Sequence, residues 1–169
     1  MEKKENNYAF IDSQNLNLGV KSMGWDLDFK KFRIYLKDKY NVSQAYIFIG
    51  YIPENQNLYR SLQKYGYLLI FKPVILDDRK EPKGNIDADL VLQTMIDLNE
   101  SKFDKCVIIT SDGDFYSLVN YLYEKSKLNA VISPYFQTCS TLLKKSAKGK
   151  IVFMNNLKNK LEYKRKSTA

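Results

Sequence analysis

The sequence predicts one α/β domain built on a mainly parallel sheet of about five strands, with helices on both faces. Short apolar segments alternate with segments of helical periodicity along the 169 residues, which is typical of repeated βαβ units. Several apolar segments, such as CVIIT, are hydrophobic at almost every position, as strands buried on both faces are. Hydrophobic residues make up 44% of the chain, enough for one packed core at this length.

The first half of the chain is predicted to contain three strands and two helices. In the first helix, Phe29, Phe32 and Leu36 recur along one face. The second helix is bounded by Pro53 before its start and by Gly66 at its end. The strands are expected over Tyr8–Ile11, Ala45–Ile52 and Tyr67–Ile75, and the helices over Asp28–Tyr40 and Glu54–Gly66.

The second half continues the alternation, and a final basic segment follows it. Apolar residues recur at i, i+3, i+4 and i+7 in one predicted helix, at Phe115, Leu118, Val119 and Leu122. Helices are expected over Asn85–Leu98, Phe115–Lys125 and Thr138–Ser146, strands over Lys105–Ser111 and Asn129–Pro134, and a last extended segment over Lys150–Met154. We assign residues 1–156 to the domain and residues 157–169 to a basic tail that could be partly disordered.

Composition excludes several classes of enzyme. Histidine is absent, which rules out a histidine general base and histidine-ligated zinc. Cys106 and Cys139 are not clustered, which argues against a zinc site or a disulfide framework, and Cys106 is expected in the core. The charged start MEKKENN does not resemble a signal peptide, and no apolar run reaches the roughly 20 residues that cross a bilayer. We therefore expect a cytoplasmic protein that uses carboxylates for any chemistry.

The net charge of +8 is concentrated at the C-terminal end. Residues 1–140 contain 18 basic and 18 acidic side chains, whereas residues 141–169 contain nine basic side chains and one acidic side chain. Such a segment is either a solvated tail or a surface that contacts phosphates in a salt-dependent manner. Sequence position alone leaves both alternatives open.

Aspartates lie next to the predicted carboxyl ends of the strands. Asp12 follows the first strand, and Asp112 and Asp114 follow the fourth. Asp87 lies at the start of the helix that precedes the fourth strand. Taken singly, each has a structural alternative as a turn residue, a helix cap or a partner of the helix dipole.

Taken together, the four aspartates favour a metal site. Ligands of open parallel sheets bind beyond the carboxyl ends of the strands, near the switch in strand order. Four carboxylates at one such edge would repel one another and raise one another's pKa values unless a cation neutralised them. Carboxylate oxygens are the ligands that Mg²⁺ and Mn²⁺ prefer.

Three motifs resemble those of the NYN domain family, in its LabA-like branch of the PIN-like nucleases. They are FIDSQNL at 10–16, KGNIDADLVL at 83–92 and ITSDGDFYSLV at 109–119. Each motif alone is short, but the three occur in the family's order, and the resemblance covers residues 8–154. It implies a Rossmann-like PIN fold and a metal-dependent endoribonuclease that hydrolyses phosphodiester bonds in RNA.

The resemblance also implies roles for individual residues. The family's catalytic, metal-binding acids, which use Mg²⁺ or Mn²⁺, correspond to Asp12, Asp87, Asp112 and Asp114. Asn15 corresponds to a residue that positions a ligand or a water, and Asp89 is a weaker candidate ligand.

The sequence departs from the family pattern at two positions. Ser13 stands where the family usually has glycine, and Gln93 stands where many relatives have an acid, with Asp97 one turn further on. These departures leave open an alternative, a catalytically weak or inactive PIN-like module that binds RNA or regulates a partner. Other enzymes with paired aspartates fit less well. Haloacid dehalogenases need Asp-x-Asp after the first strand, Toprim sites need a glutamate there, and glycosyltransferases are usually longer.

The expected partner is RNA, most simply single-stranded RNA. Basic residues near the site would contact its phosphates, namely Lys83, Lys144, Lys145 and Lys148. Tyr116 and Tyr135 could stack on unpaired bases, although packing is the simpler role in a chain with 13 tyrosines. We expect no small organic cofactor and no membrane partner, and the chain could form a homodimer.

Overall fold

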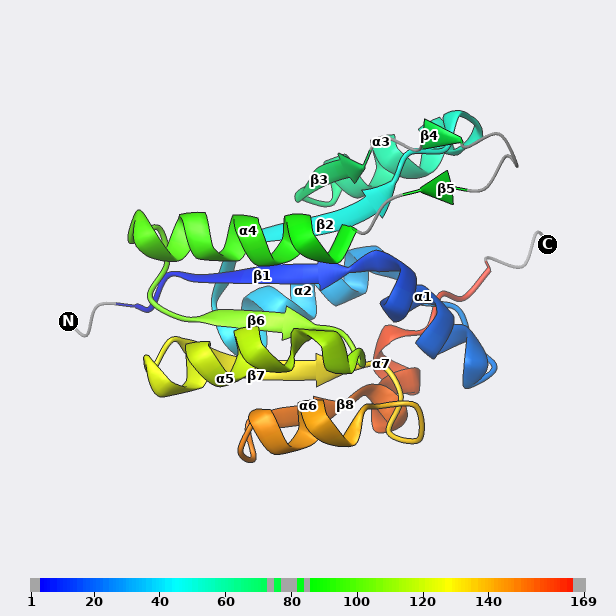
Figure 1. The fold of residues 1–169 in the computed structure, drawn as a ribbon. Coiled ribbons are helices and arrows are strands. Elements are labelled where there is room, and N and C mark those ends of the chain that lie inside the picture. Colours follow the sequence, from blue (N-terminus) through cyan, green and yellow to red (C-terminus); the bar gives the residue numbers. More distant parts are fainter. Residues whose placement is uncertain (1–3, 73–74, 77–81, 84–85, 166–169) are drawn as a thin grey trace.

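The computed structural model describes residues 4–72, 75–76, 82–83 and 86–165. Figure 1 shows a central sheet between two layers of helices, which confirms the predicted α/β, PIN-like fold. The sheet has six strands, all parallel, one more than the number expected from the sequence. The additional strand is the short C-terminal segment that the sequence indicates only as extended.

The elements alternate along the chain as the sequence predicts. The strands of the sheet are β1 (Asn7–Asp12), β2 (Val42–Gly50), β3 (Tyr67–Lys72), β6 (Cys106–Ile109), β7 (Leu128–Ser133) and β8 (Ile151–Phe153). The α-helices are α1 (Ser13–Ser22), α2 (Phe29–Tyr40), α3 (Gln56–Lys64), α4 (Ile86–Asn99), α5 (Tyr116–Glu124), α6 (Thr141–Ser146) and α7 (Lys158–Leu161). Short 3₁₀ helices are η1 (Pro53–Asn55), η2 (Gly113–Phe115) and η3 (Met154–Leu157), and a separate antiparallel pair joins β4 (Ile75–Leu76) to β5 (Pro82–Lys83).

The sheet changes its direction of growth between two central strands. Its order is β3-β2-β1-β6-β7-β8, so the chain first builds outward from β1 and later builds outward from β6 in the opposite direction. The crossover between the two halves includes α4. Ile11 of β1 pairs with Ile109 of β6, so the two strands end side by side. Such a switch point leaves a crevice at the carboxyl ends of the strands.

Successive side chains on the strands enter two separate hydrophobic cores. Ala9 and Ile11 pack with residues of α1, α2, α3 and α7, whereas Phe10 packs with residues of α4, α5 and α6 on the other face. Cys106 lies fully buried in the second core, as predicted, and its burial raises the pKa of the thiol. Within the described residues, no helix is long and apolar enough to cross a membrane.

The helix α1 is missing from the sequence-based prediction, which places no helix between the first strand and Asp28. Its sequence SQNLNLGVKS is mostly polar, and Leu16 and Val20 are its only buried hydrophobic residues. Two buried positions give too narrow an apolar stripe to identify a helix from periodicity. The helix is stabilised instead by its packing and by an N-cap at Asp12.

The chain beyond residue 156 continues into the first core. Residues 158–161, which the sequence assigns to the tail, form α7, and Leu161 is fully buried. Leu27 and Glu162 form an isolated antiparallel bridge that holds this segment near the start of α2. The β4–β5 pair lies in the segment that the sequence indicates as an extended strand end and a loop.

Candidate metal centre at the carboxyl edge of the sheet

Three helices begin at the switch point between β1 and β6. Asp12 caps α1 by accepting a hydrogen bond from the backbone N–H of Asn15 at 3.1 Å. Asp112 caps η2, which leads into α5, by accepting from the backbone N–H of Asp114 at 2.9 Å. Asp87 lies in the first turn of α4. The positive end of each helix dipole favours a carboxylate here, so capping and a shared site are compatible roles.

Three of the four predicted acids come together at this edge. Among the described residues, Asp87, Asp112 and Asp114 each place a carboxylate oxygen within 4.8 Å of the other two. Asp87 and Asp112 are partly buried and Asp114 is exposed, so the cluster opens to solvent. A set made only of carboxylate oxygens fits a hard divalent cation such as Mg²⁺ or Mn²⁺.

Asp12 lies behind this cluster and is held by the protein. Only 5% of the surface of Asp12 is accessible to solvent. Thr110 donates its hydroxyl hydrogen to the second carboxylate oxygen at 3.1 Å, while Asn15 donates to the first. Burial raises the pKa of Asp12, the two hydrogen bonds oppose this shift, and the nearby charges of Asp87 and Asp112 add to it.

Thr110 and Asn15 join the two motif loops. The Thr110 hydroxyl donates to Asp12 and also accepts the backbone N–H of Asp112 at 3.1 Å. The Asn15 side-chain oxygen accepts the backbone N–H of Ser111 at 2.6 Å. Asn15 thus positions the loop after β6 as well as α1. Sequence reasoning missed Thr110, whose only signal is a polar residue at the end of an apolar strand.

The loop after β7 supports the same region. The backbone N–H of Ser140 donates to the Ser111 carbonyl at 3.0 Å, and the hydroxyls of Ser111 and Ser133 are 2.8 Å apart. A side chain at Gly113 would collide with the side chain of Ser140. The glycine between Asp112 and Asp114 is therefore needed for close packing against this loop.

The acids further along α4 do not join the cluster. Asp89 is partly buried and lies outside the group of three, within the residues described. Asp97 is ten residues after Asp87, which corresponds to about 15 Å along a helix. It is fully buried, accepts a hydrogen bond from the Gln93 amide at 2.9 Å and lies 3.3 Å from the Lys102 ammonium. Asp97 therefore does not supply a carboxylate to the cluster in place of Gln93.

The predicted phosphate-binding lysines lie at different places. Lys144 donates to the carbonyl of Phe136 at 3.1 Å, in the loop that follows β7 at the carboxyl edge, and exposed Lys145 is next to it on α6. Lys148 lies over the ring of Tyr123, near the end of α5, and so is at the opposite edge of the sheet. The prediction for Lys83 falls on a residue of β5 whose side chain is outside the described part.

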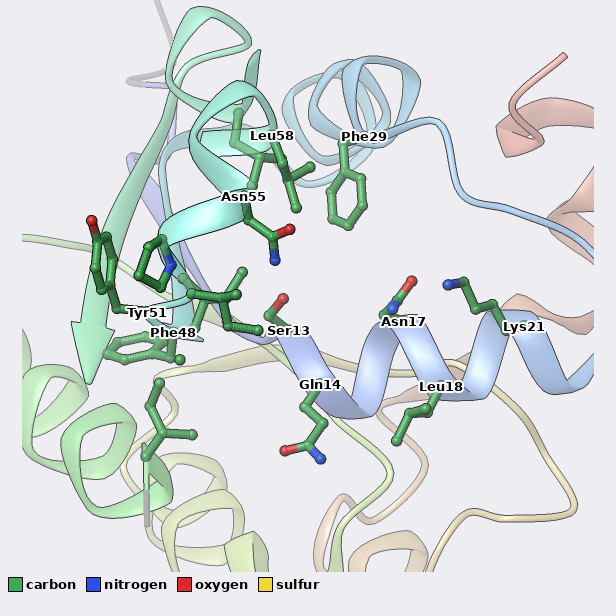
Figure 2. Close-up of a pocket in the computed structure, with 16 residues that line it drawn as sticks. Ser13, Gln14, Asn17, Leu18, Lys21, Phe29, Phe48, Tyr51, Asn55 and Leu58 are labelled. Carbon is green, nitrogen blue, oxygen red and sulfur yellow. The ribbon is translucent and has the colours of Figure 1, made fainter. Parts of the chain in front are cut away.

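A groove of about 910 Å³ adjoins the acid cluster. Figure 2 shows it between α1, the turn around η1 and the start of α2. Ile86 lines the groove and directly precedes Asp87 of the cluster. Ser13 also lines it and directly follows Asp12, which lies behind the cluster. Sequence reasoning missed this groove because it depends on α1, which the sequence does not predict.

Comparison with solved structures supports the fold. The crystal structure of a protein of unknown function from Vibrio parahaemolyticus is similar with a TM-score of 0.73, over 91% of this chain and 95% of that chain. The two sequences are 20% identical, so the similarity concerns the fold alone. No curated protein matches the sequence significantly.

The family follows from the sequence match. The profile of the NYN domain matches residues 8–155, which include all of the sheet except Asn7 of β1, and the three aspartate motifs. The LabA-like branch is a finer assignment that is compatible with this match. The chain therefore belongs to the NYN domain family of PIN-like nucleases.

Proposed function

We propose that the protein is an Mg²⁺- or Mn²⁺-dependent endoribonuclease. The observation that carries this proposal is the cluster of Asp87, Asp112 and Asp114 at the switch point of an NYN domain. Three carboxylate oxygens within 4.8 Å of one another suit a single divalent cation, which would relieve the repulsion between the carboxylates. RNA as the substrate is supported by the family resemblance and by the basic C-terminal segment, residues 141–169.

The side chains of the cluster would hold the cation and position the scissile phosphate. When bound, the cation would neutralise the carboxylates and act as a Lewis acid toward the phosphate oxygens. Asp12, with both oxygens hydrogen-bonded, keeps Thr110 and Asn15 in place and so orients the two loops that carry the cluster. Asp114, the exposed member, is suited to accept a proton from the attacking water. The expected products have 5′-phosphate and 3′-hydroxyl ends.

The test is cleavage of a labelled single-stranded RNA by the wild type and by Asp112→Asn in the presence of Mn²⁺. We expect the substitution to lower the rate by about 100-fold or more, because it removes a charged ligand and not only a supporting hydrogen bond. Asp38→Asn is the matched control, since Asp38 is an exposed acid of α2 outside the cluster. Equal metal-dependent rates for Asp112→Asn and the wild type would refute the assignment.

A second candidate function is RNA binding without cleavage. It is favoured by Gln93, which stands on α4 where the family resemblance leads us to expect an acid, and which donates a hydrogen bond to the distant Asp97. Isothermal calorimetry separates the two functions. Tight RNA binding by the wild type, together with no detectable Mn²⁺ binding and no cleavage, would establish the binding module.

A further inference from the structure

We propose that the groove beside the acid cluster holds an unpaired nucleobase of the RNA strand, next to the phosphate at the cluster. This inference deepens the proposed function and rests on it, because it names the form of RNA that the site accepts. The groove's shape, its lining and its position each support a base as the occupant.

The groove has the size and the apolar walls of a ligand site. Its volume of about 910 Å³ lies in the range of small-molecule sites, about 300–1,000 Å³. Phe29 contributes a ring that points into the space, opposite α1 in Figure 2. Leu18, Ile52 and Leu58 line the groove and remain exposed, although large apolar side chains are usually buried. Exposed apolar residues gathered around one groove indicate a binding surface.

Two amide side chains supply hydrogen-bonding groups to this apolar space. Asn17 on α1 and Asn55 at the end of η1 face each other across the groove (Figure 2). Among the described residues, neither side chain has a hydrogen-bond partner in the protein. Each amide offers both donors and an acceptor. A nucleobase carries the same mixture on its edges, whereas a purely apolar ligand would leave both amides unpaired.

The charge of the lining fits the phosphate backbone that accompanies a base. Lys21 is the only charged residue among the described residues that line the groove, and none of these residues is acidic. Figure 2 shows its ammonium group on the same side of α1 as Asn17. The groove therefore differs from the adjoining cluster, which attracts cations, and it tolerates a polyanion alongside.

A base that enters the groove should come from single-stranded RNA, because base pairing and stacking hold the bases of a duplex in place. In an A-form duplex the base edges are paired and the deep groove is too narrow for side chains, so a base cannot enter a protein groove without unstacking. An unpaired base can turn out of the strand and contact apolar and aromatic side chains directly. We therefore infer a preference for single-stranded over fully paired RNA.

The experiment measures binding of a fluorescent, mixed-sequence ten-nucleotide RNA in EDTA, single-stranded and as a duplex. Leu18→Gln is compared with Leu92→Gln, because both leucines are on helices, both are 59% exposed and only Leu18 lines the groove. Neither substitution changes the net charge. We expect Leu18→Gln to weaken binding of the single strand by about tenfold, the scale of one stacked base. Leu92→Gln should bind as the wild type does, and the duplex should bind more weakly than the single strand.

Photocrosslinking locates the base directly. A 4-thiouridine placed in the same RNA should crosslink to residues of α1, η1 or the start of α2. Asn17→Trp, which adds a bulky ring to the groove lining, should suppress these crosslinks. Crosslinks elsewhere, equal binding by Leu18→Gln and the wild type, or equal binding of duplex and single strand would overturn the inference. A free nucleoside monophosphate that binds as tightly as the RNA would overturn it too. Crosslinks in the groove without any cleavage would sustain the inference while refuting the proposed nuclease activity.

Discussion

Asp12 is a buried carboxyl group whose surroundings disfavour the charged form. It is 5% exposed, and burial and the charges of Asp87 and Asp112 raise its pKa above the value in the unfolded chain. The folded protein therefore binds a proton at this group more tightly than the unfolded chain does. The resulting destabilisation is absent below the unfolded pKa and fully present above the folded pKa, so it applies at neutral pH.

We predict that Asp12→Asn stabilises the metal-free protein at pH 7. Asparagine can still accept the hydrogen bond from Asn15 and removes the buried charge, so the gain should be on the order of 1 kcal/mol, or roughly 2–4 °C in Tm. Thermal unfolding in EDTA measures the difference, which should narrow as the pH falls through the acidic range. A variant that is less stable than the wild type at pH 7 would show that the Asp12 charge supports the fold.

The clustering of individual acids was predictable from sequence, but their hydrogen-bond partners were not. Asp112 and Asp114 directly follow an apolar strand and Asp12 ends another, so parallel pairing alone brings them to one edge. The bonds of Thr110 to Asp12 and to the Asp112 backbone depend on the register of β1 and β6. The register between two strands that are joined by a long crossover cannot be predicted from the sequence of either strand alone.

At the scale of elements, α1 is fixed by its close approach to the end of β7. A Cβ atom added at Gly19 would lie 2.5 Å from the Cβ of Pro134, the residue immediately after β7. The proline ring is tied to its own backbone and cannot rotate away. The helix therefore needs glycine in its interior, although glycine lowers helix propensity by about 1 kcal/mol relative to alanine.

We predict that Gly19→Ala destabilises the protein by about 1–3 kcal/mol, because the overlap forces α1 away from the sheet edge. Asn17→Ala is the control on the same helix, since Asn17 is exposed and alanine there should raise stability slightly. Urea unfolding of the two variants and the wild type measures both effects. Stabilisation by Gly19→Ala would mean that helix propensity outweighs the contact with Pro134.

Elements with a wide apolar face or a continuous apolar run were predictable, and those fixed by tertiary contacts were not. Strands β1, β2, β3, β6 and β7 and helices α2 to α6 all overlap the expected ranges. The helix α1 has two buried hydrophobic residues and carries no periodic signal, so the sequence does not predict it. The short β8 has three half-buried residues, and the sequence indicates it only as an extended segment. The groove lies along α1, and for that reason the sequence indicates the acids but not the surface beside them.

At the scale of the whole molecule, the C-terminal lysines are divided between the two edges of the sheet at which the parallel strands begin and end. All six strands begin at one edge of the sheet and end at the opposite edge, which carries the acid cluster, while α6 starts near the cluster and runs back. Lys144, near the loop after β7, and its exposed neighbour Lys145 lie at the edge where RNA would approach the cluster under the proposed function. Lys148 and Lys150 lie over Tyr123, and Lys150 donates to the carbonyl of Leu128 at the start of β7.

These positions predict different salt dependences for two matched double variants. The double variant Lys144→Ala, Lys145→Ala should make the plot of the logarithm of the RNA-binding constant against the logarithm of the salt concentration less steep. The magnitude of its negative slope should fall by up to about 1.4, since each phosphate contact contributes about 0.7 on a single strand. Lys148→Ala with Lys150→Ala removes the same charge from the opposite edge and should leave the slope unchanged. Binding of single-stranded RNA in EDTA, titrated with KCl, provides both slopes. Equal reductions in the two variants would show that the net charge of +8 acts as a diffuse field over the molecule and not through contacts beside the cluster.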